Sequence, residues 1–405
     1  MRLPGSKSLT NRELVLSALA SSDSVLASPL ISRDSELMIQ ALRNLGVEIH
    51  IQADSIRVVP KQLIGGTSID CGLAGTVMRF IPPVAALANG KVEFDGDPQA
   101  RQRPMATTID ALRKLGVKVE SENHSLPFSV IGNGLVTGGE LEIDASKSSQ
   151  FVSGLLLSAP RFQKGLTLTH VGESVPSLPH IDMTLKCLRD RNVSAGATSQ
   201  TSWRVEPGEL AGIEVAIEPD LSNAGPFLAA ALVSESEVRV GSWPTNTTQV
   251  GDEFRSLLER MGAEVSFSGS NLKVNGTGKI LGIKADMSEA GELVPTIAAI
   301  AALATTPSEI TGIAHLRGHE TDRIKALVTE INRIGGNAQE LEDGIAIAPG
   351  ELTGGNWHTY GDHRMATAGA IIGLKVPGIE IEDISVTSKT MPEFPSLWLN
   401  MLAGK

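Results

Sequence analysis

Cysteine and aromatic residues are scarce in this sequence of 405 residues, and each shortage excludes something. The two cysteines, Cys71 and Cys187, have no spacing that suits metal ligation. They argue against a disulfide framework and a cysteine-based zinc site, and fit a reducing compartment. Aromatic residues make up 3% of the chain, so the interior must be built from Ala, Leu, Ile, Val and Gly. With 41% apolar residues, the composition is that of a globular protein.

Long apolar runs and an excess of positive charge are also missing. The longest apolar runs, such as Ile297 to Ala304, are too short to cross a bilayer, and the first residues, MRLPGSKSLTNRE, contain no apolar signal core. The formal net charge is −11, which disfavours binding to nucleic acid or to an anionic membrane. We therefore expect a cytoplasmic protein with neither partner, in which clustered basic residues could still hold a small anion.

An amphipathic helix that ends in a turn residue and leads into an alternating strand recurs along the chain. In the first copy, Met38, Ala41, Leu42 and Leu45 follow the i, i+3, i+4, i+7 pattern of one apolar helix face. Glycine or asparagine then supplies the left-handed residue that ends a helix. The turn residues are spaced 69 to 76 residues apart, the last being a possible sixth copy: Gly46, Gly116, Asn192, Gly262, Gly335 and Gly404.

A second type of helix alternates with the first and has small apolar residues on all sides, which is typical of a buried helix. We expect its copies at 6–20, 73–88, 148–159, 221–233, 290–304 and 363–374. Six units in a chain of this length suggest two domains of three units each. Repeats of this period can also form a solenoid, but helices that are apolar all round need enclosure.

Each buried helix opens with a polar, hydroxyl-rich turn. A helix N-terminus has unpaired N–H groups and the positive end of the helix dipole, so it can bind an anion. In PGSKSLTNR (4–12), Lys7, Ser8 and Arg12 surround one such start. The spacing is not that of a Walker A loop. The alternative for this motif is a capped helix with a solvated lysine.

Six further motifs follow in order: LAGTVMR (73–79), GDPQARQRP (96–104), SSQF (148–151), HETDR (319–323), GDHRM (361–365) and SKTMPEFP (388–395). Together with PGSKSLTNR, they resemble the EPSP synthases (3-phosphoshikimate 1-carboxyvinyltransferases) over nearly the whole chain. The resemblance implies transfer of the enolpyruvyl group of phosphoenolpyruvate to the 5-hydroxyl of shikimate 3-phosphate through a tetrahedral intermediate. This reaction belongs to the shikimate pathway, which leads to chorismate and the aromatic amino acids. No cofactor or metal is implied, and we expect a monomer.

The implied fold is α/β, an inside-out barrel in which each of two similar domains has three βαβαββ units with sheets around buried helices. We expect the first domain at 8–218 and the second at 1–7 and 219–405, so that the chain crosses twice, with the active site in the cleft between the domains. Because family members carry a strand before P-G-S-K that is missing here, one sheet edge of the second domain is expected to be unpaired.

The resemblance also assigns roles to individual residues. The residues that match shikimate 3-phosphate contacts are Lys7, Ser8, Arg12, Ser148, Ser149, Gln150, Ser177, Glu292 and His319. The residues that match phosphoenolpyruvate contacts are Lys7, Gly75, Arg103, Gln150, Arg323, Arg364 and Lys389. Arginine suits these positions because its planar fork pairs with two oxygens at once. The alternatives are a helix cap for the adjacent serines and a surface charge for each arginine.

Two carboxylates and a lysine are the expected catalytic groups. Glu292 would deprotonate the attacking hydroxyl, and Glu320 would help to protonate the methylene carbon of phosphoenolpyruvate, with Lys7 as the competing acid. The alternative for Glu292 is an exposed carboxylate favoured by a helix dipole. The sequence departs from the family at five positions, where other members often have Asn, Tyr, Asp, Asn and Lys: Leu73, His180, Glu292, His315 and His319.

Two other functions remain open at this point. The UDP-N-acetylglucosamine enolpyruvyl transferases share the fold, but their catalytic cysteine would fall within 96–104, where this chain has none. A non-catalytic anion-binding protein is the other possibility. It would gain nothing from Glu292 and Glu320, because carboxylates beside an anionic ligand repel it.

Overall fold

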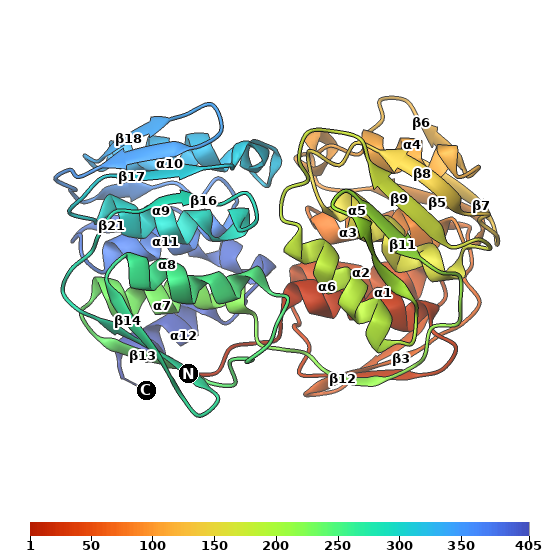
Figure 1. The fold of residues 1–405 in the computed structure, drawn as a ribbon, viewed down its shortest axis with the longest axis horizontal. Coiled ribbons are helices and arrows are strands. Elements are labelled where there is room, and N and C mark those ends of the chain that lie inside the picture. Colours follow the sequence, from red (N-terminus) through yellow and green to blue (C-terminus); the bar gives the residue numbers. More distant parts are fainter. Residues whose placement is uncertain (405) are drawn as a thin grey trace. The chain divides into compact units, whose positions relative to one another are not determined.

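The computed structural model describes residues 1–404, and the chain forms two compact units (Figure 1). We name Gly5–Ile217 the N-unit, and Met1–Pro4 together with the residues from Glu218 onward the C-unit. The sequence had placed residues 5–7 in the second domain. They belong to the N-unit because Ser6 caps, and Lys7 begins, a helix whose next residues are buried in that unit.

Two repeats of the N-unit have the complete βαβαββ pattern. One comprises β4 (Thr67–Asp70), α3 (Gly75–Ala85), β5 (Asn89–Asp95), α4 (Ala106–Lys114), β6 (Lys118–Ser121) and β7 (Phe128–Asn133). The next comprises β8 (Gly139–Ile143), α5 (Gln150–Ser158), β9 (Leu166–His170), α6 (Pro179–Asp190), β10 (Ala195–Ser199) and β11 (Ser202–Val205). Their sheets have equivalent strand orders, β4-β5-β7-β6 and β8-β9-β11-β10, with only the first pair parallel.

The first repeat of the N-unit borrows a strand from the other end of the unit. It contains α1 (Lys7–Leu19), β1 (Ser24–Ala27), α2 (Arg33–Asn44), β2 (Glu48–Ile51) and β3 (Ser55–Val59). Its missing first strand is supplied by β12 (Glu214–Ala216), which pairs parallel to β1 in the sheet β12-β1-β3-β2. This pairing ties the end of the unit to its beginning.

The C-unit repeats the pattern with two shortened sheets. Its elements are α7 (Leu221–Val233), β13 (Glu237–Val240), α8 (Phe254–Arg260), β14 (Ala263–Ser268), β15 (Asn271–Gly276), β16 (Lys284–Asp286), α9 (Val294–Ala302), β17 (Ser308–Thr311), α10 (Arg323–Arg333), β18 (Asn337–Glu340), β19 (Ile345–Ala348), β20 (Gly355–Trp357), α11 (His363–Gly373), β21 (Ile379–Ile381) and α12 (Phe394–Leu402). The strand orders are β13-β15-β14, β16-β17-β19-β18 and β20-β21. In place of a fourth strand beside β13, Met1 donates to the carbonyl of Arg239 and accepts from the N–H of Gly241.

Each unit has its own apolar core around three helices. Helices α1, α3 and α5 contact one another in the N-unit, and α7, α9 and α11 do so in the C-unit, with the sheets outside them (Figure 1). All residues of α7 and α9 are buried, as small apolar residues on every side predict. The expected α/β fold with buried central helices is therefore confirmed.

The turn residues that define the repeat adopt the predicted left-handed conformation. Every one of the six has a positive φ between 65° and 107°. The informative case is Asn192, with a φ of 65°, because asparagine is the residue after glycine that best tolerates this region. The sixth copy, proposed only as possible, has the same turn at Gly404.

Candidate functional site

Helix starts gather the predicted residues of the N-unit. Helix α1 begins at Lys7, α3 at Gly75 and α5 at Gln150. A Cβ added to Gly75 would lie 2.9 Å from Oε1 of Gln150 and 3.1 Å from Nη2 of Arg103. These three residues are therefore neighbours, and a side chain at position 75 would displace the ends of the Gln150 and Arg103 side chains.

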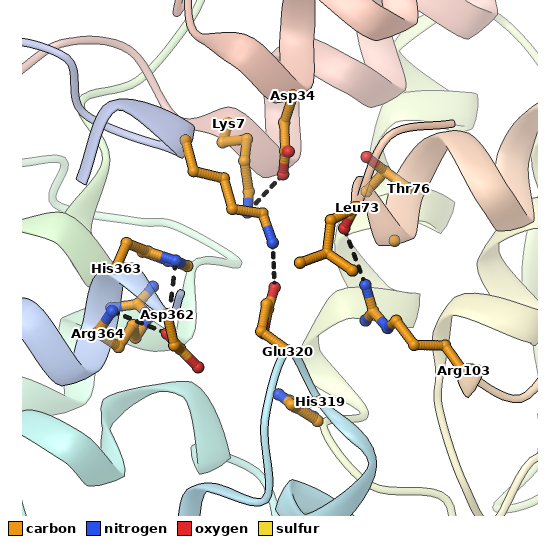
Figure 2. A network of polar contacts seen from close by, with 12 residues as sticks. Lys7, Asp34, Leu73, Thr76, Arg103, His319, Glu320, Asp362, His363 and Arg364 are labelled. Atoms are coloured by element: carbon orange, nitrogen blue, oxygen red, sulfur yellow. Dashed lines mark hydrogen bonds and ion pairs between the residues drawn. The ribbon is translucent and has the colours of Figure 1, made fainter. Parts of the chain in front are cut away.

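Arg103 is oriented by its own neighbourhood. Its Nη1 donates to the carbonyl of Leu73 at 3.0 Å (Figure 2), and Nη2 of Arg79 donates to the carbonyl of Pro104 at 2.8 Å. Arg79 lies on α3, so the loop that carries Arg103 is tied to the helix that begins at Gly75. Leu73 contributes its backbone oxygen to this contact, so its side chain does not take part in it.

Lys7 has a partner that the sequence did not single out. Its Nζ lies 3.5 Å from Oδ2 of Asp34, in the first turn of α2, and the Asp34 side chain is almost completely buried (Figure 2). An opposite charge at this distance attracts the ammonium and directs it. Asp34 is therefore a positioning residue for Lys7. Its acidic position in the first turn of a helix was the only signal in the sequence.

Arg12 lies deeper than its motif suggested. The side chain is buried, and its guanidinium donates to Oγ1 of Thr184 and to the carbonyls of Ser8 and His180, at 2.8–2.9 Å. It also lies over the ring of Phe80. The sequence left two interpretations of PGSKSLTNR, an anion cradle at the surface and a capped helix with a solvated charge. Arg12 fits neither of them, because its side chain is buried. It links α1 to α6.

The predicted serines lie at the ends of helices. Ser149 is the N-cap residue of α5, but the capping side chain is that of Ser148, whose Oγ accepts from the N–H of Gln150 at 3.2 Å. Ser177 has a φ of 56°, an unfavourable conformation for serine, shortly before α6. Backbone strain of this kind often occurs at ligand sites.

The C-unit concentrates charge around Arg323, the first residue of α10. Its Nε and Nη2 bind the two oxygens of Asp362 at 2.7 and 3.2 Å, and Nη2 also binds Glu320 at 3.0 Å. Nη1 donates to Nδ1 of His319 at 3.2 Å, so this nitrogen is unprotonated. Glu320 in turn accepts from Nζ of Lys389 at 2.6 Å.

This arrangement fixes the protonation of Arg323. Burial by itself lowers its pKa, but the charges of Asp362 and Glu320 more than offset that effect, and the pKa is raised above its ordinary value. The guanidinium has five N–H groups, and these contacts use four of them, leaving one on Nη1 for a ligand. Asp362, in the motif GDHRM, is a second residue of this site that the sequence did not single out.

Glu292 and Arg364 share a further partner, Ser222. The hydroxyl of Ser222 donates to Oε1 of Glu292, and its carbonyl accepts from Nη1 of Arg364 at 3.2 Å. The negative charge of Glu292 also acts on Arg323. Asp362 caps α11 through the N–H of Arg364 (Figure 2). The structure thus places five predicted residues of the C-unit in one network: Glu292, Glu320, Arg323, Arg364 and Lys389.

His315 is a half-buried neighbour of this network. Its Nε2 has no hydrogen-bond partner among the described residues, and a Cβ added to Gly291, next to Glu292, would lie 2.5 Å from it. Burial, and then the charge of Arg323, lower the pKa of His315 to about 4. The imidazole is therefore neutral near pH 7.

The low pKa of His315 predicts acid sensitivity of the folded chain. An unfolded histidine is protonated below about pH 6.5, whereas His315 stays neutral down to about pH 4, so stability is full above pH 6.5 and falls between these values. We expect His315→Asn to reduce this loss. Urea midpoints of both proteins at about pH 7.5 and about pH 5 measure it. An equal drop of the urea midpoint in both proteins would contradict the conclusion that the low pKa of His315 causes the acid sensitivity.

The described part of the chain has no group of three or more His, Cys, Asp or Glu residues placed to hold a metal ion. No helix within residues 1–404 is both long and apolar enough to cross a membrane.

Cys71 and Cys187 are buried and unpaired, and burial raises the pKa of both thiols. Neither thiol is therefore an activated nucleophile.

Known proteins resemble this chain over its whole length. A sequence model of EPSP synthase (3-phosphoshikimate 1-carboxyvinyltransferase) matches residues 1–398. A 3-phosphoshikimate 1-carboxyvinyltransferase of Kocuria rhizophila is 53% identical, over 100% of this chain and 93% of that protein.

Solved structures share the fold. An EPSP synthase from Acinetobacter baumannii superposes with a TM-score of 0.80 at 23% identity, covering 99% of this chain and 94% of that one. The enolpyruvyl transferase NikO from Streptomyces tendae superposes with a TM-score of 0.76 at 15% identity, covering 98% and 93%. The structural matches show the fold, whereas the sequence model over residues 1–398 and the relative at 53% identity show the family. The chain belongs to the EPSP synthase family.

Proposed function

We propose that the chain transfers the carboxyvinyl group of phosphoenolpyruvate to the 5-hydroxyl of shikimate 3-phosphate, and so serves the shikimate pathway. The observation that carries this proposal is Glu320, a carboxylate held at 2.6 Å from Lys389 and 3.0 Å from Arg323. An acid/base group embedded among cations suits a reaction in which a proton moves on an anionic substrate.

The two anionic substrates are assigned to two overlapping sets of residues. We assign shikimate 3-phosphate to Lys7, Ser8, Arg12, Ser148, Ser149, Gln150, Ser177, Glu292 and His319. We assign phosphoenolpyruvate to Lys7, Gly75, Arg103, Gln150, Arg323, Arg364 and Lys389. Since His319 accepts from Arg323 through Nδ1, its Nε2 carries the proton and would donate to a phosphate oxygen of the substrate.

The chemistry requires three proton transfers. Glu320 or Lys7 delivers a proton to the methylene carbon of phosphoenolpyruvate, which makes the adjacent carbon electrophilic. Glu292 takes the proton of the 5-hydroxyl as its oxygen bonds to that carbon, giving the tetrahedral intermediate. The group that protonated the methylene carbon, now deprotonated, then takes a proton back from the new methyl group as the C–O bond to phosphate breaks, which restores the vinyl group and releases phosphate. Positioned acid/base groups of this kind contribute about 10²–10⁴-fold each.

We further propose that the reaction takes place in a cleft between the N-unit and the C-unit, where both units contact the substrates. The acid/base carboxylates Glu292 and Glu320 belong to the C-unit, whereas Gly75, Arg103 and the serines belong to the N-unit. Closure around the substrates would exclude water and strengthen each charge contact. We propose a cytoplasmic monomer that needs no metal or cofactor.

Phosphate release tests the proposed function. We expect the full chain, incubated with shikimate 3-phosphate and phosphoenolpyruvate, to release one phosphate per carboxyvinyl group transferred. Folded protein that releases none would refute the proposal, and release only with UDP-N-acetylglucosamine would indicate the sister activity. Release with neither, together with tight binding of the anions, would indicate a binding protein.

A further inference from the structure

The turn that carries Asp362 has an unusual residue in an unfavourable conformation. The N–H of Asp362 donates to the carbonyl of Thr359 at 2.8 Å, closing a four-residue turn. Its two central residues, Tyr360 and Gly361, have φ values of 54° and 67°. Two positive φ angles define a type I′ turn, which favours Asn, Asp or Gly at both positions. Tyrosine is costly there, so its side chain must compensate.

The compensation comes from Glu330 on α10. Tyr360 is 42% exposed, but its hydroxyl donates to Oε1 of Glu330 at 2.5 Å. Glu330 is fully buried, and its Oε2 accepts from the N–H of His358 at 3.1 Å and from Nε of Arg333 at 3.0 Å. A buried carboxylate must be paired and hydrogen-bonded, and two of its three partners belong to the 358–362 segment.

The same segment is attached to α10 at a second point. Asp362 binds Arg323 through both oxygens, and Arg323 and Glu330 lie seven positions apart, about 10 Å along the helix. The segment therefore lies along α10, fixed at one end by Tyr360 and His358 and at the other by Asp362. Asp362 also caps α11 at Arg364, so one turn sets the direction of two arginines.

We propose that Tyr360 is a positioning residue for phosphoenolpyruvate: its hydroxyl, held by Glu330, fixes the turn that aims Asp362 at Arg323 and starts α11 at Arg364. The inference rests on the proposed function, in which both arginines hold this substrate. Tyr360 touches neither substrate. The hydrogen bond from Tyr360 to Glu330 anchors the turn, and without it the strained turn relaxes. Asp362 then no longer binds Arg323 through both oxygens, and the remaining N–H on Nη1 of Arg323 turns away from the ligand.

The kinetic test is Tyr360→Phe, which keeps the ring and removes the hydroxyl. We expect KM for phosphoenolpyruvate to rise about fivefold or more, with KM for shikimate 3-phosphate unchanged. A matched control is Thr359→Val, which removes the 3.4 Å contact of Oγ1 with Glu382 in the same turn but leaves the Tyr360 hydroxyl in place. Unchanged KM values in Tyr360→Phe, or an equal rise for both substrates, would overturn the proposal.

A second measurement tests the anchor without turnover, because Tyr360 is the only tyrosine of the chain. Burial and Glu330 raise the pKa of Tyr360 to about 12, so tyrosinate absorbance should appear well above the usual pH of about 10. We expect Glu330→Gln to shift this ionisation back toward that value. An unshifted ionisation would show that Glu330 does not hold the hydroxyl. Failure of the wild-type protein to turn over would refute the proposed function, and the titration would still decide on the anchor.

Discussion

Glu292→Gln is expected to lower kcat by about 10²–10⁴-fold, the contribution typical of one positioned acid/base group. Glutamine keeps the size of the side chain and can still accept from the hydroxyl of Ser222, so the local structure should persist. It cannot take the proton of the attacking 5-hydroxyl. Steady-state phosphate release measures kcat, and calorimetry measures the Kd of shikimate 3-phosphate, which should change only a few-fold.

Glu289→Gln is the matched control for this experiment. Glu289 is exposed and lies three residues earlier, before the short helical turn that carries Glu292. Its substitution removes the same charge from the same segment and should leave kcat close to the wild-type value. If Glu292→Gln also retained the wild-type kcat, another group would have to be the base.

Glu13→Ala is expected to lower the free energy of unfolding of the N-unit by about 3–5 kcal/mol, the usual cost of stranding a buried charge. The partner is Arg191, which is fully buried and binds Oε2 of Glu13 through Nη2 at 2.6 Å and Nε at 3.1 Å. Arg191 also donates to Ser24 and to the carbonyl of Ala211. Loss of Glu13 therefore weakens the joint between α1, α6 and the segment leading to β12.

An exposed ion pair in the same unit provides the comparison. Glu93 lies 2.8 Å from Lys91, and both side chains are about half exposed. Glu93→Ala should lower the free energy of unfolding far less than Glu13→Ala, because exposed pairs contribute little. Urea unfolding followed by circular dichroism measures both variants. Equal losses in the two would contradict the distinction between buried and exposed pairs.

The elements of the fold were well predicted because their signals are local. The buried helix expected at 221–233 is α7 with the same bounds, and the one expected at 363–374 is α11, Leu374 being its C-cap. The helix expected at 290–304 is shorter, since its first turn, Gly291–Leu293, is a separate 3₁₀ helix. That local deviation is what places Glu292 outside the regular helix and next to Ser222.

The partners of the site residues were not predictable in the same way. Asp34 pairs with Lys7 across 27 positions of the chain, and Asp362 pairs with Arg323 across 39. Nothing in the local pattern distinguishes these carboxylates from ordinary helix caps, a role that Asp362 also has. The burial of Arg12 was missed for the same reason, because its acceptors on α6 lie more than 160 positions away.

The sequence by itself determined the repeat, the left-handed turns and the types of residue at each helix start, since periodicity and turn chemistry act over a few residues. Only the tertiary structure decided which charges meet, that β12 completes the first sheet, and that the strained Tyr360 is held by Glu330. Those outcomes depend on packing and on the requirement that every buried charge find a partner, and both conditions join residues far apart in the chain.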